Sequence, residues 1–178
     1  MLGGRPHSRE DLCYHLRSRA AHELWLVIVD ASASTRRHRA LTDAKGLLAQ
    51  LFDDAYRQRA RMALLTASGQ APKWQVQGLK AAKNLAGWLD QLGAGGGTPL
   101  LAALAEAGHW LAVRRKRHPA EQQRLLVITD GRLKDIAGLP PLDCAGLLVD
   151  IERGPIRLGR AQDLAAGLQL VYRHIDEL

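Results

Sequence analysis

Two aspartates stand at the ends of the two most apolar runs of the sequence. Asp30 follows the run Trp25–Val29, and Asp130 follows the run Leu125–Ile128 with only Thr129 between them. Such runs are typical of strands buried on both faces of a parallel sheet, and the ligands of an open parallel sheet bind beyond the carboxyl ends of its strands. If these two strands are neighbours, two carboxylates share one crevice, and both stay ionised cheaply only with a cation between them. We therefore expect a hard divalent ion with oxygen ligands.

The loop after Asp30 offers further oxygen atoms. Asp30, Ser32 and Ser34 occupy every second position, so their side chains point the same way if the loop is extended. Hydroxyls are neutral ligands and do not overload the site with negative charge. Mg²⁺ takes six oxygen atoms at about 2.0–2.1 Å and keeps some of its waters, and Mn²⁺ accepts the same hard donors. The loop therefore predicts three ligands for Mg²⁺, with Mn²⁺ as the alternative ion.

A glycine-rich loop provides one more hydroxyl. Gly95–Gly97 precede Thr98 and Pro99, and glycine lets a backbone approach a site closely. Thr98 has two interpretations that could alternate, as a ligand of the ion or as the N-cap of a helix in which Pro99 is the first residue. The predicted metal ligands are Asp30, Ser32, Ser34, Thr98 and Asp130.

The remaining sequence alternates between strand and helix patterns. Besides the two apolar runs, strands are expected at Arg61–Thr66, Lys73–Gln77, Ala145–Ile151 and Leu168–Tyr172. Apolar residues at three- and four-residue steps predict helices at about Leu41–Ala55, Leu79–Leu92, Leu101–Leu111 and Arg160–Ala166. The run Lys73–Gln77 alternates in polarity and predicts an edge strand. This order indicates an α/β fold with a doubly wound, mostly parallel sheet and helices on both faces.

Length and composition suggest one intracellular domain. The 178 residues suit a single core, which we place at 23–178 after a lead-in segment at 1–22. No apolar run approaches the roughly 18 residues that span a bilayer, and the N-terminus has no apolar signal core, so we expect a cytoplasmic protein. Cys13 and Cys144 are too few and too distant for a disulfide framework or a zinc site, and we expect Cys144 to be buried at a strand start.

The net charge of +7 favours acidic partners. Arg36, Arg37 and Arg39 follow the predicted metal loop and could steer an acidic partner toward it. A solvated loop is the alternative, because exposed charges often contribute little. The second basic cluster, Arg114–His118, is explained by the cationic end of a helix.

The motifs together resemble a known family. DxSxS after a buried strand, GGGTP before a helix and TDG after a second buried strand resemble the metal-ion-dependent adhesion site of von Willebrand factor A domains. The segments Val29–Ser34, Asp43–Gly46, Asp54–Arg57 and Gly95–Leu100 are similar to the C-terminal domain of the magnesium chelatase D subunit and of related cobaltochelatase subunits. The resemblance implies a Rossmann-like sheet of six strands with one antiparallel edge strand.

The resemblance also implies a protein-binding module rather than an enzyme. In such domains the Mg²⁺ has a position that is open or held by water, and an aspartate or glutamate of a partner can fill it. The magnesium chelatase D subunit assembles with an AAA-type ATPase subunit, and the pair acts on a large porphyrin-binding subunit. We therefore expect docking on an AAA-type ATPase or a chelatase large subunit, in tetrapyrrole or cobalamin biosynthesis. The sequence has no AAA-type module, so we expect a stand-alone adhesion module.

Two other functions are weighed against this one. A Mg²⁺-dependent phosphohydrolase also uses an aspartate at a strand end, but Ser32 stands where a second acid would help, and no motif places a general base. A nucleic-acid-binding α/β domain would suit the charge, but the sequence has no phosphate-cradling glycine motif and only 4% aromatic residues. We therefore do not expect nucleic acid or a membrane as partner.

Overall fold

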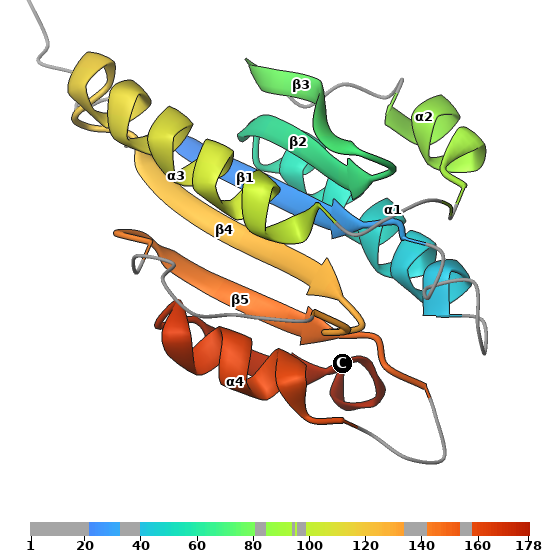
Figure 1. The fold of residues 1–178 in the computed structure, drawn as a ribbon. Helices are drawn as coiled ribbons and strands as arrows, with labels where there is room; N and C mark the ends of the chain where they lie inside the picture. The colour runs from blue at the N-terminus through green and yellow to red at the C-terminus, as the bar shows by residue number, and fades with distance from the viewer. Residues whose placement is uncertain are drawn as a thin grey trace, which may run out of the picture.

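The computed structural model describes residues 22–32, 40–80, 85–93, 95, 99–133, 142–153 and 158–178. Within these ranges six strands form one sheet in the order β3-β2-β1-β4-β5-β6 (Figure 1). The strands are β1 (Glu23–Asp30), β2 (Arg61–Ser68), β3 (Ala71–Lys80), β4 (Gln122–Thr129), β5 (Ala145–Asp150) and β6 (Val171–His174). Strand β3 pairs antiparallel with β2, and the other neighbouring strands pair in parallel.

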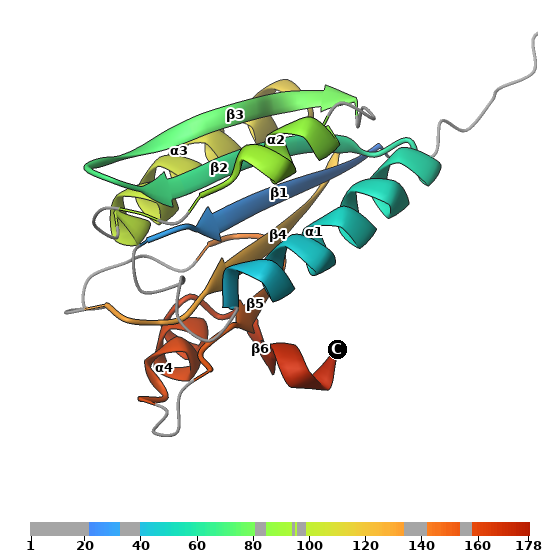
Figure 2. The same cartoon turned by 90° about the vertical axis from the view of Figure 1, so that its right-hand side faces the viewer.

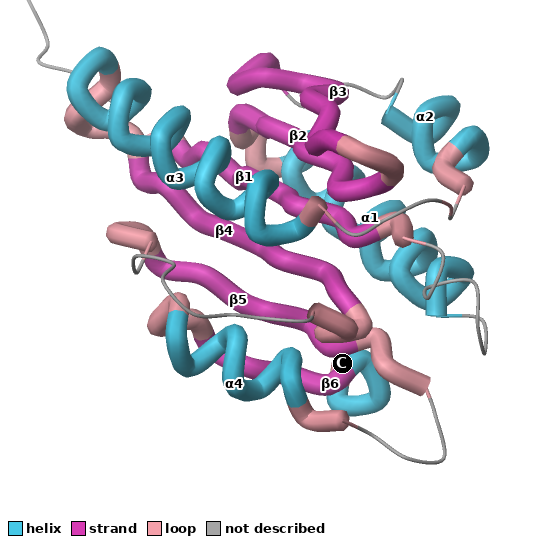
Figure 3. Tube along the Cα trace, in the orientation of Figure 1, coloured by secondary structure: helices cyan, strands magenta, loops and turns pink. Residues whose placement is uncertain are grey.

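Helices cover both faces of this sheet. They are α1 (Ala40–Arg57), α2 (Leu85–Gln91), α3 (Leu100–Arg117) and α4 (Arg160–Gly167), and a short 3₁₀ helix, η3, spans Ile175–Glu177. The buried side chains of α1 and α2 belong to one apolar core, and those of α3 and α4 to the other. Figure 2 shows α1 and α2 on the viewer's side of the sheet, and Figure 3 shows helices flanking the strands in the first view. The predicted doubly wound α/β sheet with one antiparallel edge strand is confirmed.

Alternation along β1 explains why its sequence is continuously apolar. Leu26 and Ile28 point into the core under α3 and α4, whereas Val27 and Val29 point into the core under α1 and α2. All four side chains are fully buried, which is the pattern expected of a central parallel strand. Burial on both faces therefore fixes the position of the residue that ends the strand, Asp30.

The order of the strands creates the place where a ligand can bind. From β1 the chain moves toward β2 and β3 on one side, and later toward β4, β5 and β6 on the other. The carboxyl ends of β1, β4 and β5 point to the same edge of the sheet (Figure 1). A crevice outside the strand ends at such a reversal is the usual ligand position in open α/β sheets.

Several element boundaries differ from the sequence-based prediction. The helix expected at Leu79–Leu92 begins at Leu85, because Leu79 and Lys80 extend β3 and pair with β2. Leu79 is consequently 63% exposed instead of forming a helical apolar face. The last strand begins at Val171, three residues later than expected. Hydrogen bonding between strands thus overrides the local helical periodicity.

Two smaller expectations also need correction. Cys144 was expected to be buried at a strand start, but it is half-buried and precedes the first residue of β5. Pro99 was expected as the first residue of a helix, but α3 begins at Leu100 with Pro99 as its N-cap residue. A separate property is that none of the described helices is long and apolar enough to cross a bilayer.

Candidate metal-binding site

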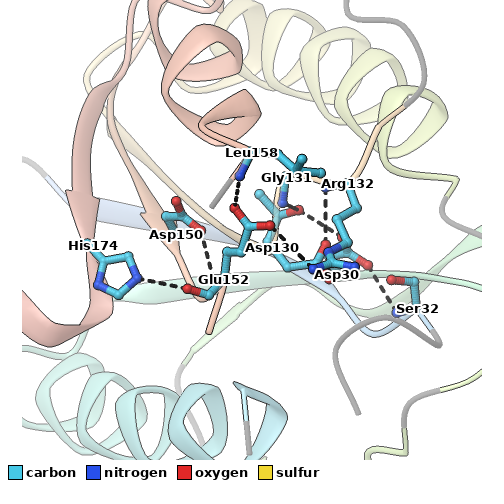
Figure 4. Close-up of polar contacts among 10 residues, drawn as sticks. Asp30, Ser32, Asp130, Gly131, Arg132, Asp150, Glu152, Leu158 and His174 are labelled. Carbon is cyan, nitrogen blue, oxygen red and sulfur yellow. Dashed lines mark hydrogen bonds and ion pairs between the residues drawn. The ribbon is translucent and has the colours of Figure 1, made fainter. Parts of the chain in front are cut away.

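The reversal of strand order brings the two predicted aspartates together. Asp30 ends β1 and Asp130 follows β4, which pairs directly with β1. The Thr129 hydroxyl links the two strand ends, because it donates to Asp30 Oδ2 at 2.8 Å and accepts from the Gly131 backbone N–H at 3.0 Å. Asp30 is 0% and Asp130 is 4% exposed. The structure therefore places two buried carboxylates at one end of the central strand pair (Figure 4).

Burial raises the pKa of the Asp30 carboxyl above its ordinary range, and the negative charge of Asp130 raises it further. Hydrogen bonds from Thr129 and Ser32 act in the opposite direction, because they stabilise the ionised form. The Ser32 backbone N–H donates to Asp30 Oδ1 at 3.0 Å, and the Ser32 side chain also bonds this carboxylate. The Asp30 carboxylate is thus held in one orientation, but at a free-energy cost that a cation would remove.

Gly131 allows the loop after Asp130 to pass close to α4. Its φ is +66°, and a Cβ placed there would lie 2.6 Å from the backbone N of Ala161 in the first turn of α4. The next backbone N–H, that of Arg132, donates to Asp130 Oδ1 at 3.2 Å. The TDG sequence therefore has a physical role at each position, with a linking hydroxyl, a carboxylate and a residue without a side chain.

The glycine-rich loop is attached to the same edge of the sheet. The Gly95 backbone N–H donates to the carbonyl oxygen of Ala31, between Asp30 and Ser32, at 2.9 Å. The structure thus brings Asp30, Ser32 and Asp130 together and fixes Gly95 beside them. The other predicted site residues, Ser34, Thr98, Arg36, Arg37 and Arg39, lie outside the described residues.

The sequence interpretation missed a third set of acidic residues at the end of β5. Asp150 is 1% and Glu152 is 3% exposed. Glu152 Oε1 lies 3.4 Å from Nη2 of Arg132, whose Nε lies 3.9 Å from Asp130 Oδ2. Asp150 accepts from the Tyr172 hydroxyl at 2.8 Å. A signal was present, because Ala145–Ile151 is an apolar run that ends in acids, like the two runs that identified Asp30 and Asp130.

The donors at this edge fit a hard divalent cation. Carboxylate and hydroxyl oxygens are the ligands that Mg²⁺ and Mn²⁺ accept. Among the described residues, no group of three His, Cys, Asp or Glu side chains could hold an ion by itself. An ion between Asp30 and Asp130 would therefore need neutral oxygen atoms as well, and Ser32 already lies against Asp30.

The comparison with known proteins agrees with this geometry. The family model of the von Willebrand factor type A domain matches residues 25–132, so the chain belongs to this family. Von Willebrand factor A domains are protein-interaction modules that commonly bind a divalent metal ion, and they are typically not catalysts.

The relatives found by sequence are longer proteins. An uncharacterized protein of Mycobacterium tuberculosis is 26% identical over 95% of this chain and 29% of its own length. The magnesium-chelatase 67 kDa subunit of Heliobacterium mobile is 32% identical over 64% of this chain and 17% of its own length. The chain thus spans less than a third of the length of either relative. The similarity to magnesium-chelatase subunits agrees with the resemblance seen in the motifs.

The fold also matches solved structures. The manganese-loaded TRAP protein of Plasmodium vivax superposes with a TM-score of 0.66 over 89% of this chain and 70% of its own, at 17% identity. At this identity the match supports the fold alone, and it agrees with a six-stranded, mostly parallel sheet.

Proposed function

We propose that this domain binds a divalent cation through Asp30, Ser32, Ser34, Thr98 and Asp130, and that the bound ion anchors a carboxylate of a partner protein. Mg²⁺ is the proposed ion and Mn²⁺ the alternative. The supporting observation is the burial of Asp30 beside Asp130, with the pKa of Asp30 raised by burial and by the second negative charge. When bound, the cation would supply a Lewis-acidic point that attracts an oxygen ligand from outside the chain.

The role of the protein is to hold its ligands ready for the ion. Thr129 and Ser32 orient the Asp30 carboxylate, and the Arg132 backbone N–H orients Asp130. These hydrogen bonds fix the direction of both carboxylates, and carboxylates held in this way need little rearrangement to bind an ion. Two acids and neutral hydroxyls leave a doubly charged ion able to accept another carboxylate, which favours a binding role over a closed structural site.

The proposed partner is an AAA-type ATPase or a large subunit of a chelatase. The similarity to magnesium-chelatase 67 kDa subunits supports this proposal. Residues 23–178 would form the binding domain and residues 1–22 its lead-in. Arg36, Arg37 and Arg39 follow the Asp30 loop in the sequence, and they would attract an acidic surface of the partner.

The test is affinity capture from extracts of the source cells, with magnesium or with EDTA. The bait proteins are the wild type, Asp30→Asn and the control Asp54→Asn, which removes one negative charge from an exposed position on α1. We expect the wild type and the control to retain the same proteins in magnesium and to lose them in EDTA. Asp30→Asn should retain them in neither. Equal capture by Asp30→Asn and the wild type would refute the proposed function.

A further inference from the structure

Glu152 is fixed in place from several sides at the edge of the candidate metal site. Its carboxylate faces Arg132 Nη2 at 3.4 Å and accepts from the Leu158 backbone N–H at 2.9 Å. Its own backbone N–H donates to Asp150 Oδ1 at 2.8 Å, and its carbonyl oxygen contacts His174 Nε2 at 3.1 Å. Figure 4 shows Glu152 between His174 on one side and Arg132 on the other.

Burying a charge is costly, so a buried carboxylate that is held by this many contacts is expected to have a role besides packing. Glu152 is 3% exposed, and it does not complete a group of three acids able to hold an ion in the described part of the chain. Its contacts instead hold two other groups in position. These are the guanidinium of Arg132 and the backbone of Leu158.

Arg132 is positioned between the candidate metal ligands and solvent. Its guanidinium faces Glu152 through Nη2 and Asp130 through Nε, and 31% of its side-chain surface is exposed. A guanidinium carries five N–H donors and matches the shape of a carboxylate. Arg132 can therefore balance the buried acids and still offer N–H groups to a carboxylate that arrives from outside.

The backbone of Leu158 lies beside the same Glu152 carboxylate that faces Arg132. Leu158 is 53% exposed, although its backbone N–H is bonded to the buried Glu152. An isolated exposed leucine has no significance in itself. The other large apolar side chains found exposed in the described ranges are Tyr56, Leu79, Val171 and Leu178. Leu158 bonds directly to Glu152 through its backbone N–H.

We propose that Arg132 and Leu158, both held by Glu152, form a recognition rim that selects a partner segment with an acidic side chain next to an apolar one. The inference rests on the proposed function, because the acidic side chain is the one that reaches the ion. Arg132 adds a charge-assisted hydrogen bond to that carboxylate, and Leu158 packs against the neighbouring apolar side chain. The partner is therefore a protein segment that carries aspartate or glutamate beside a residue such as leucine or phenylalanine.

This arrangement predicts that removing Arg132 affects Mg²⁺ affinity and partner affinity differently. Arg132 carries a positive charge beside Asp130, so its removal should leave Mg²⁺ affinity unchanged or raise it. The same removal should weaken binding of an acidic segment by about ten- to a hundredfold, the range for a hydrogen bond to a charged group. A residue that only supported the fold would weaken both interactions together.

The experiment uses a displayed library of random short peptides, selected on the immobilised wild-type protein in magnesium and eluted with EDTA. Enriched peptides are then synthesised, and their affinities are measured by fluorescence anisotropy. The variants are Arg132→Gln, Arg132→Lys and Leu158→Ser, with Arg57→Gln and Leu79→Ser as controls at exposed positions on α1 and β3. Mg²⁺ affinity is measured separately by calorimetry for every variant.

The expected peptides contain an acidic residue with an apolar neighbour. Arg132→Gln and Leu158→Ser should bind them more weakly while keeping Mg²⁺ affinity, Arg132→Lys should recover part of the affinity, and the two controls should match the wild type. Unchanged peptide affinity in Arg132→Gln and Leu158→Ser would overturn the recognition rim and leave the proposed function standing. Loss of Mg²⁺ binding in Arg132→Gln would also overturn it, since Arg132 would then be structural. If no peptide needs magnesium, the proposed function itself fails.

Discussion

The close approach of the Asp130 loop to α4 predicts a specific penalty for Gly131→Ala. Alanine at a φ of +66° pays the cost of the left-handed region, about 1 kcal/mol. The new Cβ would also lie 2.6–2.9 Å from the N, Cα and Cβ atoms of Ala161. These atoms cannot move without shifting the first turn of α4, and overpacking of this kind costs about 1–3 kcal/mol. We therefore expect a loss of about 3 kcal/mol in the free energy of unfolding.

Gly69→Ala is the matched control for this substitution. Gly69 has a φ of +71° in the turn between β2 and β3, and no atom lies within 4 Å of the position that a Cβ would take there. Alanine at Gly69 therefore has only the backbone cost, about 1 kcal/mol. For a chain of this size each kcal/mol lowers the melting temperature by about 2–4 °C. Gly131→Ala should thus melt roughly 6–12 °C below the wild type, and Gly69→Ala roughly 2–4 °C below it.

Both variants are measured by urea and thermal denaturation followed by circular dichroism, in EDTA. The difference between them isolates the contact with α4, because the backbone cost is common to both. If the two alanine variants lose the same stability, the contact between the Asp130 loop and α4 has no energetic weight. The role assigned to Gly131, that of bringing α4 against the candidate site, would then be wrong.

Three further predictions concern the charged groups. Asp30→Asn should abolish the rise in melting temperature that Mg²⁺ gives the wild type, which is about 1.4 kcal/mol of stabilisation when Mg²⁺ is at ten times its dissociation constant; a magnesium-dependent rise in this variant, seen by differential scanning fluorimetry, would count against Asp30 as a ligand. The folded-state pKa of Asp30 lies above its unfolded value, so the folded chain binds more protons at pH values between these two pKa values, and in EDTA the contribution of Asp30 to stability should fall as the pH rises through that interval. This contribution is measured as the difference in stability between the wild type and Asp30→Asn in urea titrations at several pH values. A difference that does not vary with pH would contradict the assignment. Tyr172→Phe should lower the free energy of unfolding by about 1–3 kcal/mol in urea denaturation, because the buried Asp150 loses a hydrogen bond of 2.8 Å. The Mg²⁺ affinity of this variant, measured by calorimetry, should match that of the wild type, and a large loss of that affinity would place Asp150 in the metal site.

The fold could be predicted where strands are buried on both faces of the sheet. Strands β1 and β4 are buried on both faces at their carboxyl ends, so their sequences are uninterrupted apolar runs that end at a polar residue. That feature indicated the positions of Asp30 and Asp130 and the parallel sheet at once. The length of β3 could not be predicted in the same way, because Leu79 and Lys80 are exposed and are held in the strand by pairing with β2. Pairing between strands depends on partners distant in the sequence, which local periodicity does not contain.

The same distinction holds for the candidate site, where residues that follow a strong apolar strand could be predicted and the others could not. Asp30 and Asp130 were found because each follows a strong strand, and the structure places them side by side. The roles of Arg132 and Glu152 depend on how the ends of β4 and β5 face one another, and neither residue belongs to a spaced motif. The acids that end the β5 run were visible in the sequence. Their connection through Arg132 became clear only from the distances between side chains.

The most direct test of the central claim is a crystal structure of the protein grown with Mn²⁺, with diffraction data collected at the manganese absorption edge. We expect one strong anomalous difference peak between the carboxylates of Asp30 and Asp130, next to the Ser32 hydroxyl. A protein with both aspartates in place but no anomalous peak between them would contradict a shared cation at this edge of the sheet.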